Sequence, residues 1–186
     1  MTTGLTAQTP DKLELGAGVL LKNFNFTNNT FVDADIICAT RGGGSINIIP
    51  AKRDRLVDGA KPNTIGLIAI DYWTCEMSFT GIEITEELLR QALGHADITG
   101  TTNRIIRPRH RVNTSDFSTV YWRGERADGV AIVIQLDNVI NSNGLVITRT
   151  DRGESTVSFV LRGNYGLTTQ NTVPCAIHVL QAPTAP

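Results

Sequence analysis

The chain has 186 residues, of which 41% are apolar and 19% are charged, and its formal net charge at pH 7 is -1. This length fits one hydrophobic core better than two, so we expect a single domain, 1–186, with long appendages. The balance of 17 basic and 18 acidic residues speaks against a dedicated nucleic-acid-binding protein, which needs an excess of Lys and Arg to neutralise phosphates.

The N-terminal part of the chain predicts short strands after a polar beginning. Residues 1–12 are small and polar and predict a flexible segment without the basic and apolar regions of a secretory signal. Strands are predicted at 19–24, 36–40 and 45–49. The triplet 42–44 is glycine throughout, and the residues after it (SINII) are typical of a strand and not of a helix. We therefore interpret the triplet as a turn between strands and not as a phosphate-binding loop.

A charged, proline-containing stretch of sixteen residues, 51–66 (AKRDRLVDGAKPNTIG), separates two predicted strands. Connections longer than ~12 to 15 residues are uncommon in compact domains and are usually functional or disordered. One interpretation is an unordered surface loop. We favour an arm that is flexible in the isolated subunit and ordered against another subunit or ring. Its candidate contact residues are Arg53, Asp54, Arg55, Asp58 and Lys61.

The clearest period of two in the sequence lies in residues 70–84. This pattern predicts a long strand with one apolar face inside the subunit and one polar face toward water. The apolar face comprises Trp73, Cys75, Met77 and Phe79, and the polar face includes Thr74, Glu76, Ser78 and Thr80.

One helix is predicted, from about Glu86 to Leu93. Thr85 supplies an N-cap oxygen, the acidic first turn suits the positive end of the helix dipole, and Gly94 tolerates the left-handed geometry of a C-terminal cap. Leu88 and Ala92 belong to its apolar stripe. A helix after a long strand in a β-rich chain predicts a mainly β fold, a sandwich or a barrel, with the helix packed on its side.

Four arginines occur within the eight residues RIIRPRHR. They could contact phosphate groups, but the neutral overall charge and the absence of interleaved stacking aromatics argue against this role. We favour pairing with acidic groups of a neighbouring subunit. The cluster comprises Arg104, Arg107, Arg109 and Arg111.

The C-terminal third predicts further strands at 120–123, 130–136, 145–150, 157–165 and 176–180, followed by a short tail, 181–186. Asp151, Arg152 and Gly153 form a turn signal, so 145–150 and 157–165 are expected to pair as a hairpin.

The sequence lacks the usual signatures of catalysis. It contains neither a Gly-x-Ser-x-Gly elbow nor a His-Glu-x-x-His pair. Cys38, Cys75 and Cys175 lie far apart in strand-like sequence without zinc-ligand spacing, and we expect buried thiols. We therefore predict that the protein is not an enzyme and holds no metal or cofactor. The longest apolar stretches fall far short of the ~20 residues that cross a bilayer, so no membrane partner is expected.

The order of these segments resembles the tail tube proteins of long-tailed bacteriophages. The similarity is carried by KLELGAGVLLKNF (12–24), ATRGGGSINIIP (39–50), VDGA (57–60) and the long strand after it, ITEELLRQALG (84–94), and LDNVINSNGLVITRTDRGESTVSFVLRGNY (136–165). One departure is that lumens in this family tend to be acidic, whereas this chain is nearly neutral.

The resemblance implies a structural virion protein that forms six-membered rings stacked into a hollow tube for DNA passage. It implies as partners other copies of the chain, a tail terminator, a tape-measure protein, baseplate or tail-tip proteins, and DNA in transit through non-specific contact. The implied location is the virion tail, after synthesis and assembly in the bacterial cytoplasm. On this view the polar face of residues 74–80 lines the lumen, with the hairpin 145–165 as the alternative lining.

Three other functions stay open from the sequence. The first is the inner tube of a contractile phage tail or of a phage-derived bacteriocin. The second is a tail terminator or connector that forms a ring but does not polymerise. The third is a small β-domain that binds nucleic acid through the arginine cluster.

Overall fold

The computed structural model describes residues 6–14, 16 and 18–180, and these residues are mainly β with one α-helix. The predicted fold class, mainly β with a single helix, is therefore confirmed. The helix is α1 (Glu86–Leu93), and the strands are β1 (Val19–Leu21), β2 (Ile36–Cys38), β3 (Thr40–Asp54), β4 (Ile68–Gly81), β5 (Ala96–Thr99), β6 (Ile105–Pro108), β7 (Ser118–Glu125), β8 (Ala131–Asn141), β9 (Val146–Thr148), β10 (Thr156–Arg162) and β11 (Cys175–Leu180).

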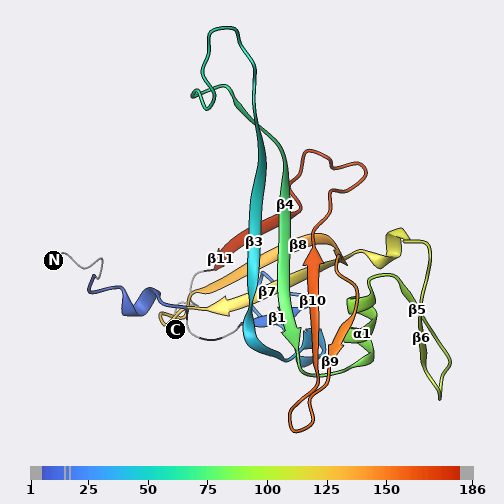
Figure 1. Ribbon diagram of the computed structural model, residues 1–186. Coiled ribbons are helices and arrows are strands. Elements are labelled where there is room, and N and C mark those ends of the chain that lie inside the picture. The colour runs from blue at the N-terminus through green and yellow to red at the C-terminus, as the bar shows by residue number, and fades with distance from the viewer. Residues whose placement is uncertain (1–5, 15, 17, 181–186) are drawn as a thin grey trace.

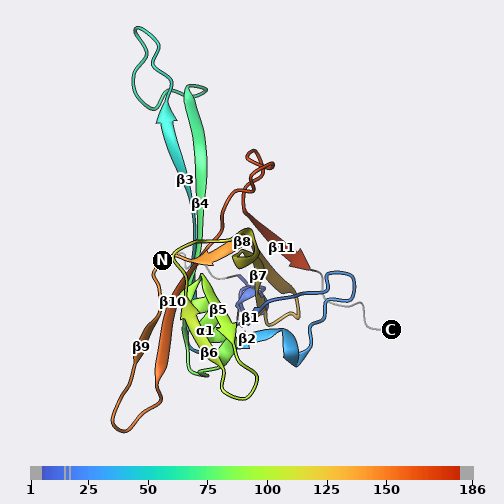
Figure 2. The same ribbon diagram turned by 90° about the vertical axis from the view of Figure 1, so that its right-hand side faces the viewer.

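Nine strands form one antiparallel sheet in the order β2-β1-β7-β8-β10-β4-β3, with β11 paired to β8 and β9 paired to β10. β7 pairs with β8 as far as Val139 and β11 as far as Leu136, whereas the last residues of β8, Ile140 and Asn141, pair with β10. Asn138, with φ of 49°, lies at the register shift of the β7–β8 ladder. The sheet folds over at β8 in this way, and Figure 2 shows β3, β4, β10 and β9 as one layer and β8, β11, β7, β1 and β2 as the other.

The hydrophobic core lies between these two parts of the sheet. Its buried residues come from both layers and from α1, and they are Leu20, Ile37, Cys38, Cys75, Met77, Phe79, Leu88, Ala92, Val120, Leu136, Val139, Val157, Phe159 and Leu161. α1 contacts β2, β8 and β10, so its apolar stripe covers the core beside the sheet, as the sequence predicted (Figure 1).

The ends of α1 follow the predicted caps. The backbone N–H of Leu88 donates a hydrogen bond of 3.1 Å to the hydroxyl of Thr85. Gly94 has φ of 77°, and its N–H donates to the carbonyl oxygens of Arg90 and Gln91. A left-handed residue at this position costs little only because glycine has no Cβ.

β4 shows the predicted alternation. Cys75, Met77 and Phe79 are buried, while the intervening polar side chains are partly exposed. The strand covers Ile68–Gly81 and not 70–84, because the chain leaves the sheet after Gly81 to reach the cap of α1.

The glycine triplet is not a turn between strands, and this prediction was wrong. It lies inside β3, where the register moves from Thr40 opposite Gly81 to Gly44 opposite Phe79. Gly42 and Gly43 both have φ of 73°. Glycines reach this left-handed region without strain, so the extra residues are accommodated as a bulge in a continuous strand.

The loop in the predicted arm, 51–66, is shorter than expected. Residues 51–54 continue β3, and β4 begins at Ile68, so the loop covers 55–67. The cross-strand ladder to Asp54 and Ile68 keeps these charged residues in a strand. The hairpin of β5 and β6, which pairs Ala96 with Pro108 at one end, was not predicted.

The terminal segments are described in part. Residues 1–5 and the predicted C-terminal tail, 181–186, lie outside the described residues. Pro10–Lys12 forms a short 3-10 helix. Next to it, the backbone N–H groups of Ala127 and Asp128 donate to the carbonyl oxygens of Leu13 and Asp11 at 2.9 and 3.0 Å. The end of the segment predicted to be flexible is therefore bonded to the turn between β7 and β8.

Candidate assembly surfaces

A long β-hairpin projects from the body of the protein. The ladder of β10 with β4 ends at Glu76, and beyond it no other strand of the described residues lies beside the β3–β4 pair. Their far ends and the connecting loop extend well past the rest of the chain in both views (Figures 1 and 2). We call residues 49–72 the projecting hairpin.

The distal part of the projecting hairpin exposes apolar side chains on both of its faces. Ile49 is opposite Thr74 and Tyr72 is opposite Ala51, so both lie on one face, because directly paired residues share a face of a sheet. The register shifts between Ala51 and Lys52, where Asp71 is an extra residue, so Ile70 and Ile68 lie on the other face, opposite Lys52 and Asp54. All four are about half exposed. We call Ile49, Ile68, Ile70 and Tyr72 the distal apolar group. Ile49 and Tyr72 continue the face that carries Thr74 and Glu76 nearer the body.

The loop at the tip adds two apolar side chains that the rest of the subunit leaves uncovered. Leu56 is 97% exposed and Ile65 is 98% exposed. Exposed apolar side chains that gather in one region mark sites of interaction with another molecule. Sequence reasoning missed these two side chains, because it took the charged residues of 51–66 as the contact residues.

The charged residues predicted to make contacts lie on the same hairpin. Arg53 donates to Asp71 across the strands at 2.5 Å, and Asp54 accepts a hydrogen bond from the backbone of Asn63 at 3.3 Å. Arg55, Asp58 and Lys61 are exposed on the loop, and within the described residues none of these three forms an ion pair. The structure therefore gathers the five predicted residues at one end of the molecule.

The predicted lumen residues form part of a polar face that spans three strands. Thr74, Glu76, Ser78 and Thr80 are each partly exposed on β4. β3 contributes Ser45 and Asn47 opposite Ser78 and Glu76, and β10 contributes Ser158 and Arg162 opposite Thr80 and Glu76. The guanidinium of Arg162 lies 3.0 Å from the carboxylate of Glu76. The long strand and the hairpin 145–165, proposed above as alternative linings, therefore belong to one continuous surface.

The four arginines of the cluster have two different environments. Arg104 bonds Glu86 of α1 at 2.5 Å, and Arg109 pairs with Asp97 at 2.8 Å and with Asp116. The acidic partners expected from another subunit are thus found within the chain for Arg104 and Arg109, where they tie the β5–β6 hairpin to α1 and to the segment before β7.

The other two arginines keep their charge at the surface. Arg107 and Arg111 are exposed, and no carboxylate of the described chain lies within ion-pair distance of either. The cluster that the sequence presents as one unit therefore offers two guanidinium groups, and not four, to another molecule.

Several strand edges are open in the part of the chain that the structure describes. Two of them are on long strands: β3 ends the path of the large sheet opposite β2, and β11 has β8 on one side. β11 also exposes Ile177 and Val179, each by more than half. Open edges present unpaired N–H and C=O groups to any strand that approaches them.

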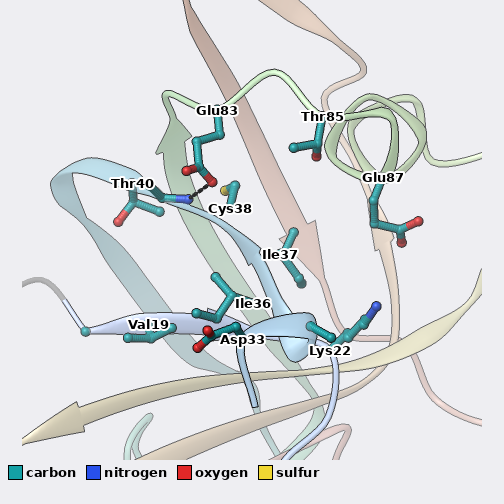
Figure 3. Close-up of a pocket in the computed structure, with 13 residues that line it drawn as sticks. Val19, Lys22, Asp33, Ile36, Ile37, Cys38, Thr40, Glu83, Thr85 and Glu87 are labelled. Carbon is teal, nitrogen blue, oxygen red and sulfur yellow. Dashed lines mark hydrogen bonds between the residues drawn. The ribbon is translucent and has the colours of Figure 1, made fainter. Parts of the chain in front are cut away.

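A surface groove of about 680 Å³ lies between β2 and the start of α1 (Figure 3). Glu83 accepts a hydrogen bond of 3.1 Å from the backbone of Ala39, and Glu87 accepts from Arg90. Burial first, and then the charge of Glu83, raise the pKa of the Cys38 thiol to about 11. A thiol that stays protonated at neutral pH is a poor nucleophile, so Cys38 is poorly suited to nucleophilic chemistry in this groove.

Among the described residues, no three His, Cys, Asp or Glu side chains gather closely enough to hold a metal ion. None of the helices in the described ranges is both long and apolar enough to cross a membrane.

Comparison with known proteins gives no assignment. No protein-family model matches the sequence, and no curated protein matches it. The function is therefore inferred from the surfaces described above.

Proposed function

We propose that this protein is a structural subunit whose function is to assemble with copies of itself into six-membered rings that stack as a hollow tube. The observation that carries the proposal is the projecting hairpin. In the folded subunit the distal apolar group keeps about half of its surface exposed, and Leu56 and Ile65 keep almost all of theirs. Contact with another copy would remove them from water, which favours association.

The open edges of β3 and β11 support ring formation. They lie in different layers of the folded sheet, so an edge of one copy can meet a different edge of the next. Such a head-to-tail contact repeats around a ring when the rotation between copies closes. Pairing between copies would also cover edges that otherwise invite uncontrolled aggregation.

The polar face of β3, β4 and β10 supports a lumen lining. It carries mostly hydroxyl and amide groups, and its charged residues Glu76 and Arg162 neutralise each other at 3.0 Å. A wall with little net charge holds few phosphates, so DNA would pass without being gripped.

The remaining roles follow from the resemblance to tail tube proteins. We propose that the tube forms the tail of a virion assembled in the bacterial cytoplasm and that it conducts DNA. Its further partners are a tail terminator, a tape-measure protein and baseplate or tail-tip proteins. No reaction is assigned to the chain, because its function is assembly.

The test is direct imaging of the concentrated full-length protein by negative-stain electron microscopy, with sedimentation of the same samples. Sixfold rings and tubes are expected. A protein that stays monomeric at high concentration would overturn the proposal. Rings without tubes would favour a terminator or connector, and a salt-dependent shift of DNA mobility without rings would favour nucleic-acid binding. A sheath protein encoded beside this chain would identify the tube as the inner tube of a contractile tail.

A further inference from the structure

Cys75 and Cys175 lie a hundred residues apart in sequence, and their sulfur atoms are 2.8 Å apart in the structure. Cys75 lies in β4 and is fully buried, whereas Cys175 begins β11 and is partly exposed. The two strands belong to opposite layers of the folded sheet and are not paired to each other. The two sulfurs therefore form a contact between the layers.

The backbone holds both cysteines in place. The carbonyl oxygen of Cys75 accepts a hydrogen bond of 2.9 Å from Gly163, and Cys175 lies in register with Leu136 of β8. The carbonyl of Pro174, just before Cys175, accepts from Asp137 at 3.0 Å. A disulfide requires a sulfur separation of about 2.05 Å, so its formation needs a small movement of two side chains and no rearrangement of strands.

We propose that Cys75 and Cys175 are the site of a disulfide that staples the two layers of the sheet when the protein meets a small-molecule disulfide oxidant. The thiolate of Cys175, the accessible partner, attacks one sulfur of the oxidant, breaks its S–S bond and releases one small thiol. The thiolate of Cys75 then attacks the Cys175 sulfur of this mixed disulfide and releases the second small thiol. The two cysteines are oxidised, the oxidant is reduced to two thiols, and these take up the two protons.

The second step is expected to be the slower one. In the reduced protein, burial first, and then the hydrogen bond to Cys175, raise the pKa of Cys75 to about 12. Burial persists in the mixed disulfide and disfavours the Cys75 thiolate there at neutral pH. The mixed disulfide on Cys175 should therefore accumulate before the cross-link forms. Cys38 is a control within the same chain, because it is buried in β2 and no other cysteine sulfur of the described residues contacts it.

The experiment treats the full-length protein with oxidised glutathione, blocks remaining thiols with iodoacetamide under denaturing conditions and measures mass and peptides by mass spectrometry. We expect one alkylated cysteine, Cys38, a peptide linking Cys75 to Cys175, and loss of the link after reduction with dithiothreitol. Three alkylated cysteines, a permanent glutathione adduct on Cys175, or a link that includes Cys38 would each overturn the proposal.

Thermal unfolding provides a second measurement. A cross-link that closes a loop of this length should raise the melting temperature by roughly 10 °C. The Cys38→Ala variant should keep this increase, whereas Cys75→Ala should lose both the increase and the linked peptide. An oxidised protein that melts no higher than the reduced one would show that the bond does not hold the layers together. Thiol counting and melting require no rings or tubes, so this proposal can fail or succeed separately from the proposed function.

Discussion

The double substitution Leu56→Asp with Ile65→Asp tests whether the tip of the projecting hairpin drives assembly. Both side chains are almost fully exposed in the subunit, at 97% and 98%. If another copy covers them, each contributes about 1.5 to 3 kcal/mol to the contact through apolar burial. The pair then contributes roughly 3 to 6 kcal/mol for each subunit added.

That free energy sets the expected size of the effect. A factor of ten in an equilibrium constant corresponds to about 1.4 kcal/mol. The critical concentration for tube formation should therefore rise by ~10² to ~10⁴ fold in the double aspartate variant. The free energy of unfolding of the monomer should change by less than about 0.5 kcal/mol, because substitutions at exposed positions rarely have larger effects.

The assay is sedimentation of tubes over a concentration series, with urea unfolding of the unassembled protein as the measure of stability. The matched control is Leu56→Met with Ile65→Val, which keeps apolar groups at both positions and should assemble at nearly the wild-type concentration. Assembly of the double aspartate variant at the wild-type critical concentration would refute the role of the tip.

Three further predictions concern stability. The guanidinium of Arg162 lies 3.0 Å from the carboxylate of Glu76, so Glu76→Lys would place two cations side by side. This variant should lower the free energy of urea unfolding by up to about 1 kcal/mol. Adding Arg162→Glu should restore the free energy of unfolding, and no recovery would contradict the pairing. Asn141 is buried, and its side chain donates to the carbonyl of Gly144 at 2.8 Å and accepts from the backbone N–H of Val160 at 3.0 Å. Asn141→Leu should therefore lower the free energy of urea unfolding by roughly 2 to 4 kcal/mol. The matched control, Asn143→Ala at an exposed position, should lower it little. Burial raises the pKa of Cys38 from 9.0 to about 11, so the stabilisation from the protonated thiol is complete below about pH 9 and is lost as pH rises toward 11. Between these pH values Cys38→Ala should reduce the decline of the unfolding free energy by about 1.4 kcal/mol per pH unit. An unchanged slope would exclude this thiol as its cause.

Local patterns predicted the parts of the fold that depend on local chemistry. The alternation from Trp73 to Thr80 identified β4 and its buried face, and the cap residues Thr85 and Gly94 identified both ends of α1. In each case the decisive interaction involves residues close in sequence or a simple period. The assignment of a mainly β fold followed from several such segments.

The errors arose where the partner lies elsewhere in the chain. The glycine triplet contains turn-forming residues, but its pairing with β4 makes it a bulge inside β3. Arg104 and Arg109 have acidic partners at positions 86, 97 and 116, which no local pattern connects to them. Cys75 and Cys175 likewise meet only because the sheet folds over at β8.

The change in character along one face of β4 connects the fold to the proposed assembly. From Glu76 to Thr80 this face is polar and β4 has neighbours on both sides, β3 and β10. Beyond Glu76 the ladder with β10 ends, and exposed apolar side chains follow: Tyr72 on the same face, and Ile70 and Ile68 on the other face after the register shift at Asp71. A two-stranded hairpin is marginally stable in water by itself, so this segment needs an additional partner at the point where its own sheet stops supplying one. Exposed apolar residues on the projecting hairpin would lower the solubility of the monomer unless another copy covers them. The pattern along β4 therefore favours a hairpin that packs against a second subunit.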